Sequence, residues 1–252
     1  MKKYINKFFA LFGLSIIKKS SLGKINNEIL KEPIIEEEFK YLVKKVEGIY
    51  KKRFSPNSLY SVYSLCKYIY ENNIEGDIIE CGVYEGVCIA MAIIYFAEKK
   101  DFSRNIYLYD TFEGMTNPSD KDYYFLNDKK LNYGDNFCSL ENVKLNLSSI
   151  KYDNSRIHFI KGDVLKTLNK KRHQKISLLR LDTDFYDSTI YELKNLYGSV
   201  IKNGFIIYDD YGHWKGQYDA VNDFHKSINL KPLLIRTSRK ERIEIKIKEF
   251  FI

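Results

Sequence analysis

The sequence has few cysteines, and their arrangement excludes several protein classes. Four occur in 252 residues. They show no Cys-x-x-Cys spacing and are too sparse for a disulfide framework or a zinc-finger pattern. We therefore expect reduced thiols in a cytoplasmic protein, with a buried cysteine serving as a small apolar residue. The four are Cys66, Cys81, Cys88 and Cys138.

The sequence also lacks internal repeats, low-complexity tracts, Pro/Gly/Ser-rich linkers and long apolar runs. The apolar stretch Phe8–Ile17, within the basic segment Met1–Ser20, is far shorter than the ~20 residues that span a bilayer. No suitable small-residue cleavage site follows it, which disfavours a signal peptide. We expect an amphipathic helix that packs on the protein body, as at a homodimer contact, and contact with a membrane surface is the alternative.

Basic residues exceed acidic ones, and the formal net charge is +8. One interpretation is an electrostatic field that attracts an anionic substrate such as a nucleotide-linked sugar. The other is the solvated surface of a generally Lys-rich protein. Nucleic acid is not an expected partner, because the many Tyr and Phe residues lie mainly in apolar runs and not within a basic stripe.

From Gly76 onward, short apolar runs that end in acidic residues alternate with helical stretches. This pattern predicts an α/β fold, with a mostly parallel seven-stranded sheet and helices on both faces. The predicted strands are Ile78–Cys81, Ile106–Tyr109, Ile157–Ile160, Ile176–Leu181, Phe205–Tyr208, Pro232–Arg236 and Ile243–Ile247. The predicted helices among them are Val87–Lys99, Ser188–Ile201 and Gln217–Ser227. We divide the chain into an N-terminal helical extension or lid, residues 1–75, and a main domain, residues 76–252, with a lid insertion at about 117–150.

The first strand–helix junction contains the motif Glu80-Cys-Gly82-Val-Tyr-Glu-Gly86. Its two glycines would let the backbone turn sharply and approach a ligand, and a tight turn with helix–sheet packing is the alternative. The spacing is not Gly-x-Gly-x-x-Gly, and Glu80 and Glu85 would repel a pyrophosphate. Carboxylates suit a cationic sulfonium cofactor with an amino group, so the junction favours S-adenosylmethionine.

Two further acidic residues follow the next strands. Asp110 stands where a carboxylate accepts hydrogen bonds from ribose hydroxyls. Asp163 lies within reach of the adenine, although a helix N-cap explains it equally well.

Two acidic segments, Leu181–Tyr186 and Tyr208–Trp214, each follow an apolar strand. Parallel strands present their carboxyl ends at one edge of a sheet, so these carboxylates should converge there. Buried carboxylates without a partner are costly, and an all-oxygen set suits a hard ion such as Mg²⁺. The predicted cluster consists of Asp182, Asp184, Asp209 and Asp210. A cap or a salt bridge is the alternative for Asp182 and also for the Asp209–Asp210 pair.

Three side chains of the same segments have open roles. His213 is a candidate base or substrate contact, and a plain hydrogen-bonding residue is the alternative. Trp214 and Tyr186 could stack on a sugar face or pack in the core.

The sequence resembles the macrocin O-methyltransferase family, whose members methylate deoxysugars. The matching stretches are Gly76–Gly86, Tyr109–Met115, Leu179–Thr189 and Gly204–Trp214. The resemblance implies a Rossmann-like class I methyltransferase fold, S-adenosylmethionine and Mg²⁺. It implies Asp182, Asp209 and Asp210 as metal ligands and Asp184 as the general base. His213 is a second catalytic candidate from the residues themselves. The expected cofactor residues are Glu80, Gly82, Tyr84, Gly86, Asp110, Thr111, Asp163 and Asp182.

The resemblance has departures. A Trp is common in the family where Tyr84 stands, and small residues usually occupy the positions of Val87 and Cys88. The segment Asn117–Ile150 shows no match, so it says little about the acceptor.

We therefore expect an O-methyltransferase for a sugar hydroxyl, on a nucleotide-activated heptose or deoxyhexose used for capsule or lipopolysaccharide. The alternatives are a catechol-type O-methyltransferase for a phenol and a non-catalytic protein that binds the adenosyl cofactor.

Overall fold

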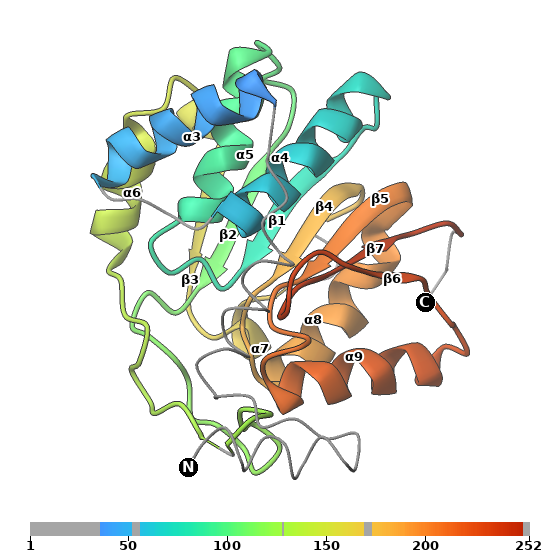
Figure 1. Cartoon of the computed structure of the whole chain (residues 1–252). Helices are drawn as coiled ribbons and strands as arrows, with labels where there is room; N and C mark the ends of the chain where they lie inside the picture. Colours follow the sequence, from blue (N-terminus) through green and yellow to red (C-terminus); the bar gives the residue numbers. More distant parts are fainter. Residues whose placement is uncertain (1–35, 52–55, 128, 169–172, 249–252) are drawn as a thin grey trace, which may run out of the picture. The chain divides into compact units, whose positions relative to one another are not determined.

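The computed structural model describes residues 36–51, 56–127, 129–168 and 173–248, and the predictions for Met1–Ser20 fall outside them. The chain divides after Glu37, and the second unit, Glu38–Ile252, holds the fold. Its core is a seven-stranded sheet in the order β3-β2-β1-β4-β5-β7-β6 (Figure 1). The strands are β1 Asp77–Cys81, β2 Ile106–Asp110, β3 Ile157–Lys161, β4 Ile176–Leu181, β5 Val200–Tyr208, β6 Leu234–Arg236 and β7 Arg242–Ile245.

Strands β1 to β5 pair in parallel, and β7 pairs antiparallel with both β5 and β6. The mostly parallel seven-stranded sheet is thereby confirmed. Strand order reverses between β1 and β4, with β2 on one side of β1 and β4 on the other. A crevice at the carboxyl ends of such strands is where open α/β sheets bind ligands.

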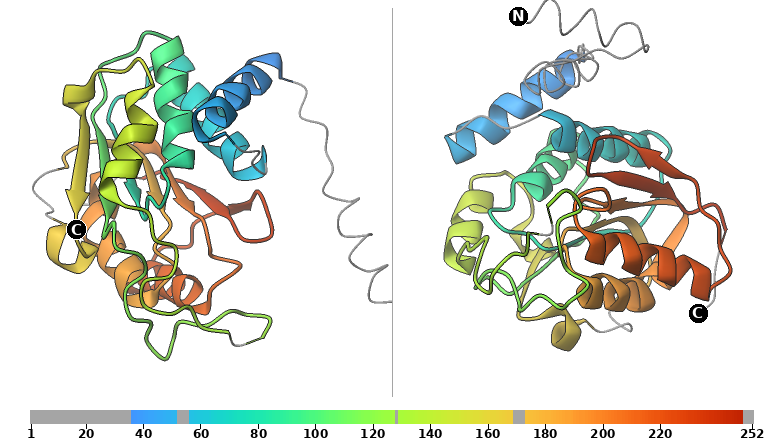
Figure 2. Two further views of the ribbon diagram at one scale, coloured as in Figure 1. Left: turned by 90° about the vertical axis from the view of Figure 1, so that its left-hand side faces the viewer. Right: turned by 60° about the horizontal axis from the view of Figure 1, so that its bottom comes forward.

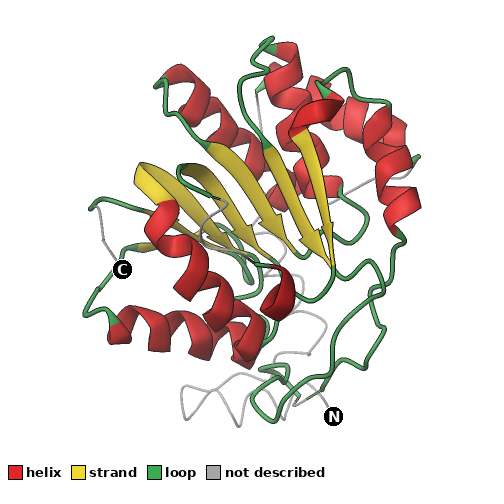
Figure 3. Ribbon diagram, turned by 180° about the vertical axis from the view of Figure 1, so that it is seen from behind, coloured by secondary structure: helices red, strands yellow, loops and turns green. Residues whose placement is uncertain are grey.

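Helices cover both faces of the sheet, as Figures 2 and 3 show. One face carries α3 Glu37–Tyr50, α4 Pro56–Glu71, α5 Val87–Glu98 and α6 Leu140–Ser148. The other carries α7 Val164–Thr167, α8 Tyr186–Leu196 and α9 Lys215–Ser227. Among the helices of the described residues, none is long and apolar enough to cross a membrane.

The apolar runs form the core for the expected reason. All six residues of β4 are buried, because helices cover both of its faces. Helix α5 has an almost entirely apolar sequence, and it packs against α4. Burial of these side chains, about 1.5–3 kcal/mol for each large one, holds the layers together.

One predicted boundary was wrong. The helical stretch expected over Ser188–Ile201 ends earlier, because α8 stops at Leu196 and a 3-10 turn follows at Tyr197–Ser199. Val200 then pairs with Ile176 of β4, so β5 begins at Val200. Strand pairing decides this boundary, and local helical periodicity does not reveal it.

The segment expected as a lid, residues 117–150, contains two different parts. Its second part includes α6, which lies beside α5, with the Val143 side chain 3.3 Å from where a Cβ on Gly86 would stand. Its first part is a loop at the carboxyl end of the sheet, where Tyr124 forms an isolated antiparallel bridge with Trp214.

Candidate functional site

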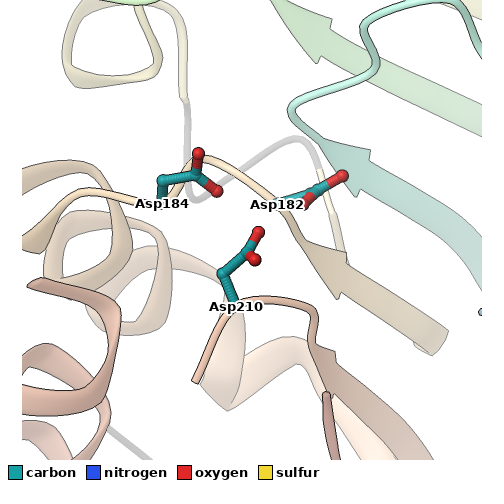
Figure 4. Close-up of side chains that lie close together, drawn as sticks. All are labelled: Asp182, Asp184 and Asp210. Carbon is teal, nitrogen blue, oxygen red and sulfur yellow. The ribbon is translucent and has the colours of Figure 1, made fainter. Parts of the chain in front are cut away.

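Three carboxylates meet where β4 and β5 end. One oxygen each of Asp182, Asp184 and Asp210 lies within 4.8 Å of the others, a spacing that one metal ion could span (Figure 4). Asp182 and Asp184 follow β4, and Asp210 follows β5, its parallel neighbour. The sheet therefore gathers residues that lie far apart in the sequence.

The backbone turns sharply at Asp184, between the end of β4 and the start of α8. Asp184 has φ +62, a left-handed conformation that Asp tolerates better than most residues. Phe185 N donates to Thr183 O at 2.7 Å, which closes the turn around Asp184. This turn ends the strand and brings the Asp184 carboxylate back toward Asp182 and Asp210.

Asp209 lies apart from the three gathered oxygens, unlike the metal-ligand set that the family resemblance implied. Its Oδ1 is 2.7 Å from Arg180 Nη2, and its Oδ2 accepts a hydrogen bond from Lys240 Nζ. Asp209 is 1% exposed, so these two cations neutralise a buried charge. The structure thus places Asp184 in the cluster and pairs Asp209 with cations of the protein itself.

The electrostatics of the cluster suit a bound cation. Burial raises the pKa of Asp182 and of Asp184 well above the usual range, and the neighbouring carboxylates raise both further. Burial also opposes ionisation of Asp210, but hydrogen bonding from His213 and the charge of Lys240 bring its pKa below the usual range. Asp182 and Asp184 would ionise far more readily beside a divalent ion, and their oxygens are the donors Mg²⁺ prefers.

His213 belongs to the same cluster. Its Nδ1 lies 2.9 Å from Asp210 Oδ1, and the ring of Tyr124 meets it edge-on, with 4.6 Å between centroids. The hydrogen bond orients the imidazole beside the carboxylates, where it can contact a substrate.

A cavity of about 560 Å³ opens over the cluster, a volume typical of small-molecule sites. Its first end lies at the loops after β1, β2 and β3 and is lined by Gly82, Tyr84, Asp110, Thr111, Gly162 and Asp163. Its second end is lined by Thr116, Tyr124, Asn127, Lys129, Asp184, His213, Trp214 and Lys240. Asp182 and Asp210 also line the cavity. The acidic cluster therefore faces a cavity that residues from all of these loops line.

The first end depends on a close approach of two loops. Gly82 has φ +81, and a Cβ there would lie 2.1 Å from the carbonyl oxygen of Asp182. Asp110 Oδ2 accepts hydrogen bonds from Val83 N and Tyr84 N at 2.7 and 2.9 Å. The carboxylate predicted to bind a ribose therefore also holds the loop after β1 in shape.

Two predicted cofactor residues do not line this cavity. Glu80 is 1% exposed, and its Oε1 accepts a hydrogen bond from Arg180 Nη1 at 2.5 Å. Gly86 has φ +83 and is the N-cap of α5. Asp163 lines the cavity. It is also the N-cap of α7, where its side chain accepts a hydrogen bond from Leu165 N.

A model of the macrocin O-methyltransferase (TylF) family matches residues 56–238, more than half of the chain. The chain belongs to the macrocin O-methyltransferase family. The sequence resemblance is thereby confirmed.

Individual relatives agree. Demethyldecarbamoylnovobiocin O-methyltransferase of Streptomyces niveus is 28% identical over 172 residues, which are 67% of this chain and 65% of the relative. A second relative, 8-demethyl-8-(2,3-dimethoxy-alpha-L-rhamnosyl)-tetracenomycin-C 4'-O-methyltransferase of Streptomyces olivaceus, is 27% identical over 155 residues, 61% of this chain and 59% of the relative. Each match spans less than two thirds of the relative's length.

The structure of the O-methyltransferase NovP has the same architecture. It aligns with a TM-score of 0.69 and 24% identity, covering 76% of this chain and 80% of that one. The prediction of a Rossmann-like class I methyltransferase fold is thereby confirmed.

The sequence analysis missed three charged residues of this family member's site. Arg180 could have been found from the sequence, because it is the one charged residue of the buried strand β4. Nothing in the sequence indicated Lys240, because it reaches the site from the distant turn between β6 and β7. Asp122 lies in the unmatched segment, and it is 1% exposed.

Proposed function

We propose that this chain transfers a methyl group from S-adenosylmethionine to a sugar hydroxyl, assisted by Mg²⁺. The observation that carries the proposal is the cluster of Asp182, Asp184 and Asp210 in the cavity that Gly82 and Asp110 also line. A methyl donor at the first end and an acceptor at the second would meet at these carboxylates. Membership of the family supports the same reaction class.

In this proposal Asp182 and Asp210 hold the metal ion. Mg²⁺, when bound, supplies stabilisation of the negative charge that develops on the attacking oxygen. Asp209 is neutralised by Arg180 and Lys240, so it would join the ligands only if Lys240 withdrew from it.

Asp184 accepts the proton of the sugar hydroxyl. Burial raises its pKa well above the usual range, and a carboxylate with a raised pKa is a stronger base once ionised. His213, held by Asp210, orients the acceptor from the same side of the cavity.

The first end of the cavity holds the cofactor. Gly82 lets the loop after β1 approach the ligand closely, and Asp110 and Thr111 lie where ribose hydroxyls would be bound. Asp163 would contact the adenine and Tyr84 the methionine part, because both line this end of the cavity. Glu80 acts behind this surface, because it is paired with Arg180 and does not line the cavity.

A sugar fits the second end better than a phenol does. A flat phenolic ring calls for an apolar slot, whereas Asn127, Lys129 and His213 offer polar contacts for several hydroxyls. One relative's name specifies a rhamnosyl acceptor. Lys129 and Lys240 would also favour an anionic substrate such as a nucleotide-activated heptose or deoxyhexose.

Methyl-transfer assays test the proposal. Purified full-length protein is incubated with S-adenosylmethionine and dTDP-rhamnose, an uncharged methyl rhamnoside or catechol, and methylated product is measured by mass spectrometry. We expect methylation of a sugar, lost with EDTA and restored by Mg²⁺. Turnover that survives complete metal removal, or methylation of catechol alone, would refute the proposal.

The biological setting stays a prediction. A role in capsule or lipopolysaccharide synthesis, a cytoplasmic location, a homodimer and a lid role for residues 1–75 all require direct tests. Deletion of the gene followed by glycan analysis for a lost O-methyl group tests the first.

A further inference from the structure

A loop borders the acceptor end of the cavity, and we call residues 116–127 the acceptor loop. It is joined by backbone hydrogen bonds to the segment after β5: Lys215 N donates to Tyr123 O at 2.9 Å, and Phe125 N donates to His213 O at 3.2 Å. Tyr124 lies between these bonds and contacts the rings of both His213 and Trp214. The position of this loop therefore decides the shape of the acceptor end.

Asp122 is the buried charge of the acceptor loop. Its Oδ1 accepts a hydrogen bond from Tyr186 N at 2.7 Å, and its Oδ2 accepts from Ser119 N and Ser119 Oγ at 2.7 and 2.6 Å. Only 1% of the residue is exposed. Hydrogen bonds to a buried carboxylate are among the stronger ones, so this contact is a firm attachment point.

This attachment lies at the beginning of two helices. The N-cap residues of α8 and α9, Phe185 and Trp214, form no side-chain cap hydrogen bond. Asp122 Oδ1 accepts a hydrogen bond from the first amide of α8 in the place of a missing cap, and its negative charge lies favourably near the positive end of the helix dipole. The same oxygen would lie 2.0 Å from a Cβ on Gly216, in the first turn of α9. Gly216 therefore leaves the space that the Asp122 carboxylate occupies.

These two helices directly follow the two acidic segments. Asp184 is two residues before Tyr186, and His213 is two residues before Lys215. A side chain that joins the acceptor loop to both helix starts also sets the loop's distance from the base and from the histidine.

We propose that Asp122 is a positioning residue that fastens the acceptor loop to the starts of α8 and α9, and so places the acceptor against Asp184 and His213. The inference rests on the proposed function for its kinetic consequence but not for the attachment itself. The base of the loop is held independently, because Met115 N donates to Asp135 O and Gly134 N to Met115 O. Loss of Asp122 therefore removes the attachment of the acceptor loop to the start of α8, while the backbone bonds to the segment after β5 remain and the cofactor end stays in place.

Substitution of Asp122 by Ala tests the inference. The exposed neighbour Asp120, which pairs with Lys130 at the surface, provides the matched control as Asp120→Ala. We expect Asp122→Ala to speed amide hydrogen exchange in residues 116–127 and at Tyr186 by about tenfold, the size expected for one lost hydrogen bond to a charged group. With dTDP-rhamnose as acceptor we expect KM to rise about tenfold, with the Kd of S-adenosylmethionine unchanged within twofold. Asp120→Ala should match the wild type in all three measurements.

Two further variants separate positioning from simple loss of folding. Asp122→Asn keeps an oxygen that can accept from Tyr186 N, so it should recover part of the exchange protection and of the KM. Gly216→Ala should loosen the acceptor loop from the other side, because its methyl group would displace the Asp122 carboxylate.

The results separate this inference from the proposed function. Unchanged amide exchange of the acceptor loop in Asp122→Ala would overturn the inference. It would also be overturned if the variant lost global stability, cofactor binding and kcat together, because the effect would then not be local to the loop. If the wild-type protein methylates no sugar, the proposed function fails, and the exchange data still decide whether Asp122 holds the loop.

Discussion

Arg180 Nη2 lies 2.7 Å from Asp209 Oδ1, and within β4 the residues on either side of Arg180 are the buried Leu179 and Leu181. The same guanidinium donates through Nη1 to Glu80 and to Asp182, at 2.5 and 2.8 Å. One buried cation thus balances carboxylates from β1 and from the loops after β4 and β5. The positive charge at the centre of the acidic site is therefore the Arg180 guanidinium.

A protein in which Arg180 is replaced should therefore unfold more easily than the wild type. Arg180→Met leaves Glu80 and Asp209 buried without this partner, and breaking a buried ion pair costs about 3–5 kcal/mol. Burial already raises the pKa of Glu80 to about 7, although Arg180 opposes that shift. Urea denaturation measures the change. Arg156→Met is the control, because the exposed Arg156–Asp153 pair should contribute less than about 1 kcal/mol. Equal losses in the two variants would contradict the assignment.

Gly82 should not tolerate a side chain. Gly82→Ala places a Cβ 2.1 Å from the Asp182 carbonyl oxygen, so the loops after β1 and β4 must separate. Gly134→Ala is the matched control, because Gly134 also has φ +81 but nothing lies within 4 Å of its Cβ position. Both variants bear the strain of a positive φ, and only Gly82→Ala should also lower the melting temperature sharply and weaken S-adenosylmethionine binding. Calorimetry measures both, and similar behaviour of the two variants would be evidence against the close approach.

Lys240 should compete with the metal ion. Its Nζ pairs with Asp209 and lies 3.8 Å from Asp210 Oδ1. Lys240→Met removes a charge of the same sign as the metal ion, so Mg²⁺ affinity should rise by at least about tenfold. That change, ~1.4 kcal/mol, lies between the ~1 kcal/mol of a ~4 Å charge pair in water and the ~4 kcal/mol of one near a protein surface. Titration calorimetry with Mg²⁺ measures the affinity. Lys161→Met, which removes the exposed pair with Glu113, should leave it unchanged. Weaker Mg²⁺ binding in Lys240→Met would show that Lys240 does not compete with the metal ion.

Asp184→Asn separates a base from a ligand. If Asp184 accepts the proton, kcat should fall by about 10²–10⁴ while Mg²⁺ and cofactor affinities stay within a few-fold. Asp210→Asn should instead weaken Mg²⁺ binding first. A large loss of Mg²⁺ affinity in Asp184→Asn would make Asp184 a ligand, in keeping with its place in the three-oxygen cluster.

Glu192 should make stability depend on pH. Burial raises its pKa to about 8, opposed by a hydrogen bond from Thr183 Oγ1 at 3.1 Å. The folded state then holds this proton more tightly than the unfolded chain does, so the contribution to stability is present below about pH 4.5 and is lost as pH rises through 8. Relative to Glu192→Gln, the wild type should lose at most about 1.4 kcal/mol per pH unit between pH 5 and 8. Urea denaturation at several pH values measures this, with the exposed Glu141→Gln as a control that should keep the wild-type slope. Parallel curves for wild type and Glu192→Gln would disprove the effect.

Much of the fold was predictable because it is local. The run ISLLRL at Ile176–Leu181 is a strand buried on both faces, and its composition alone indicates this. The end of α8 was misjudged because pairing of Val200 with Ile176 is a contact between distant residues.

Contiguous motifs determined the family, the glycine turn at Gly82 and the two acidic segments, because each is a property of neighbouring residues and of strand ends. Only the tertiary structure decided that Asp209 leaves the predicted cluster and pairs with Arg180 and Lys240. It also decided where Asp122 attaches the acceptor loop. Lys240 meets Asp209 across 31 residues and Asp122 meets Tyr186 across 64. No pattern of neighbouring residues records such contacts, because they exist only once the sheet has brought its strand ends together.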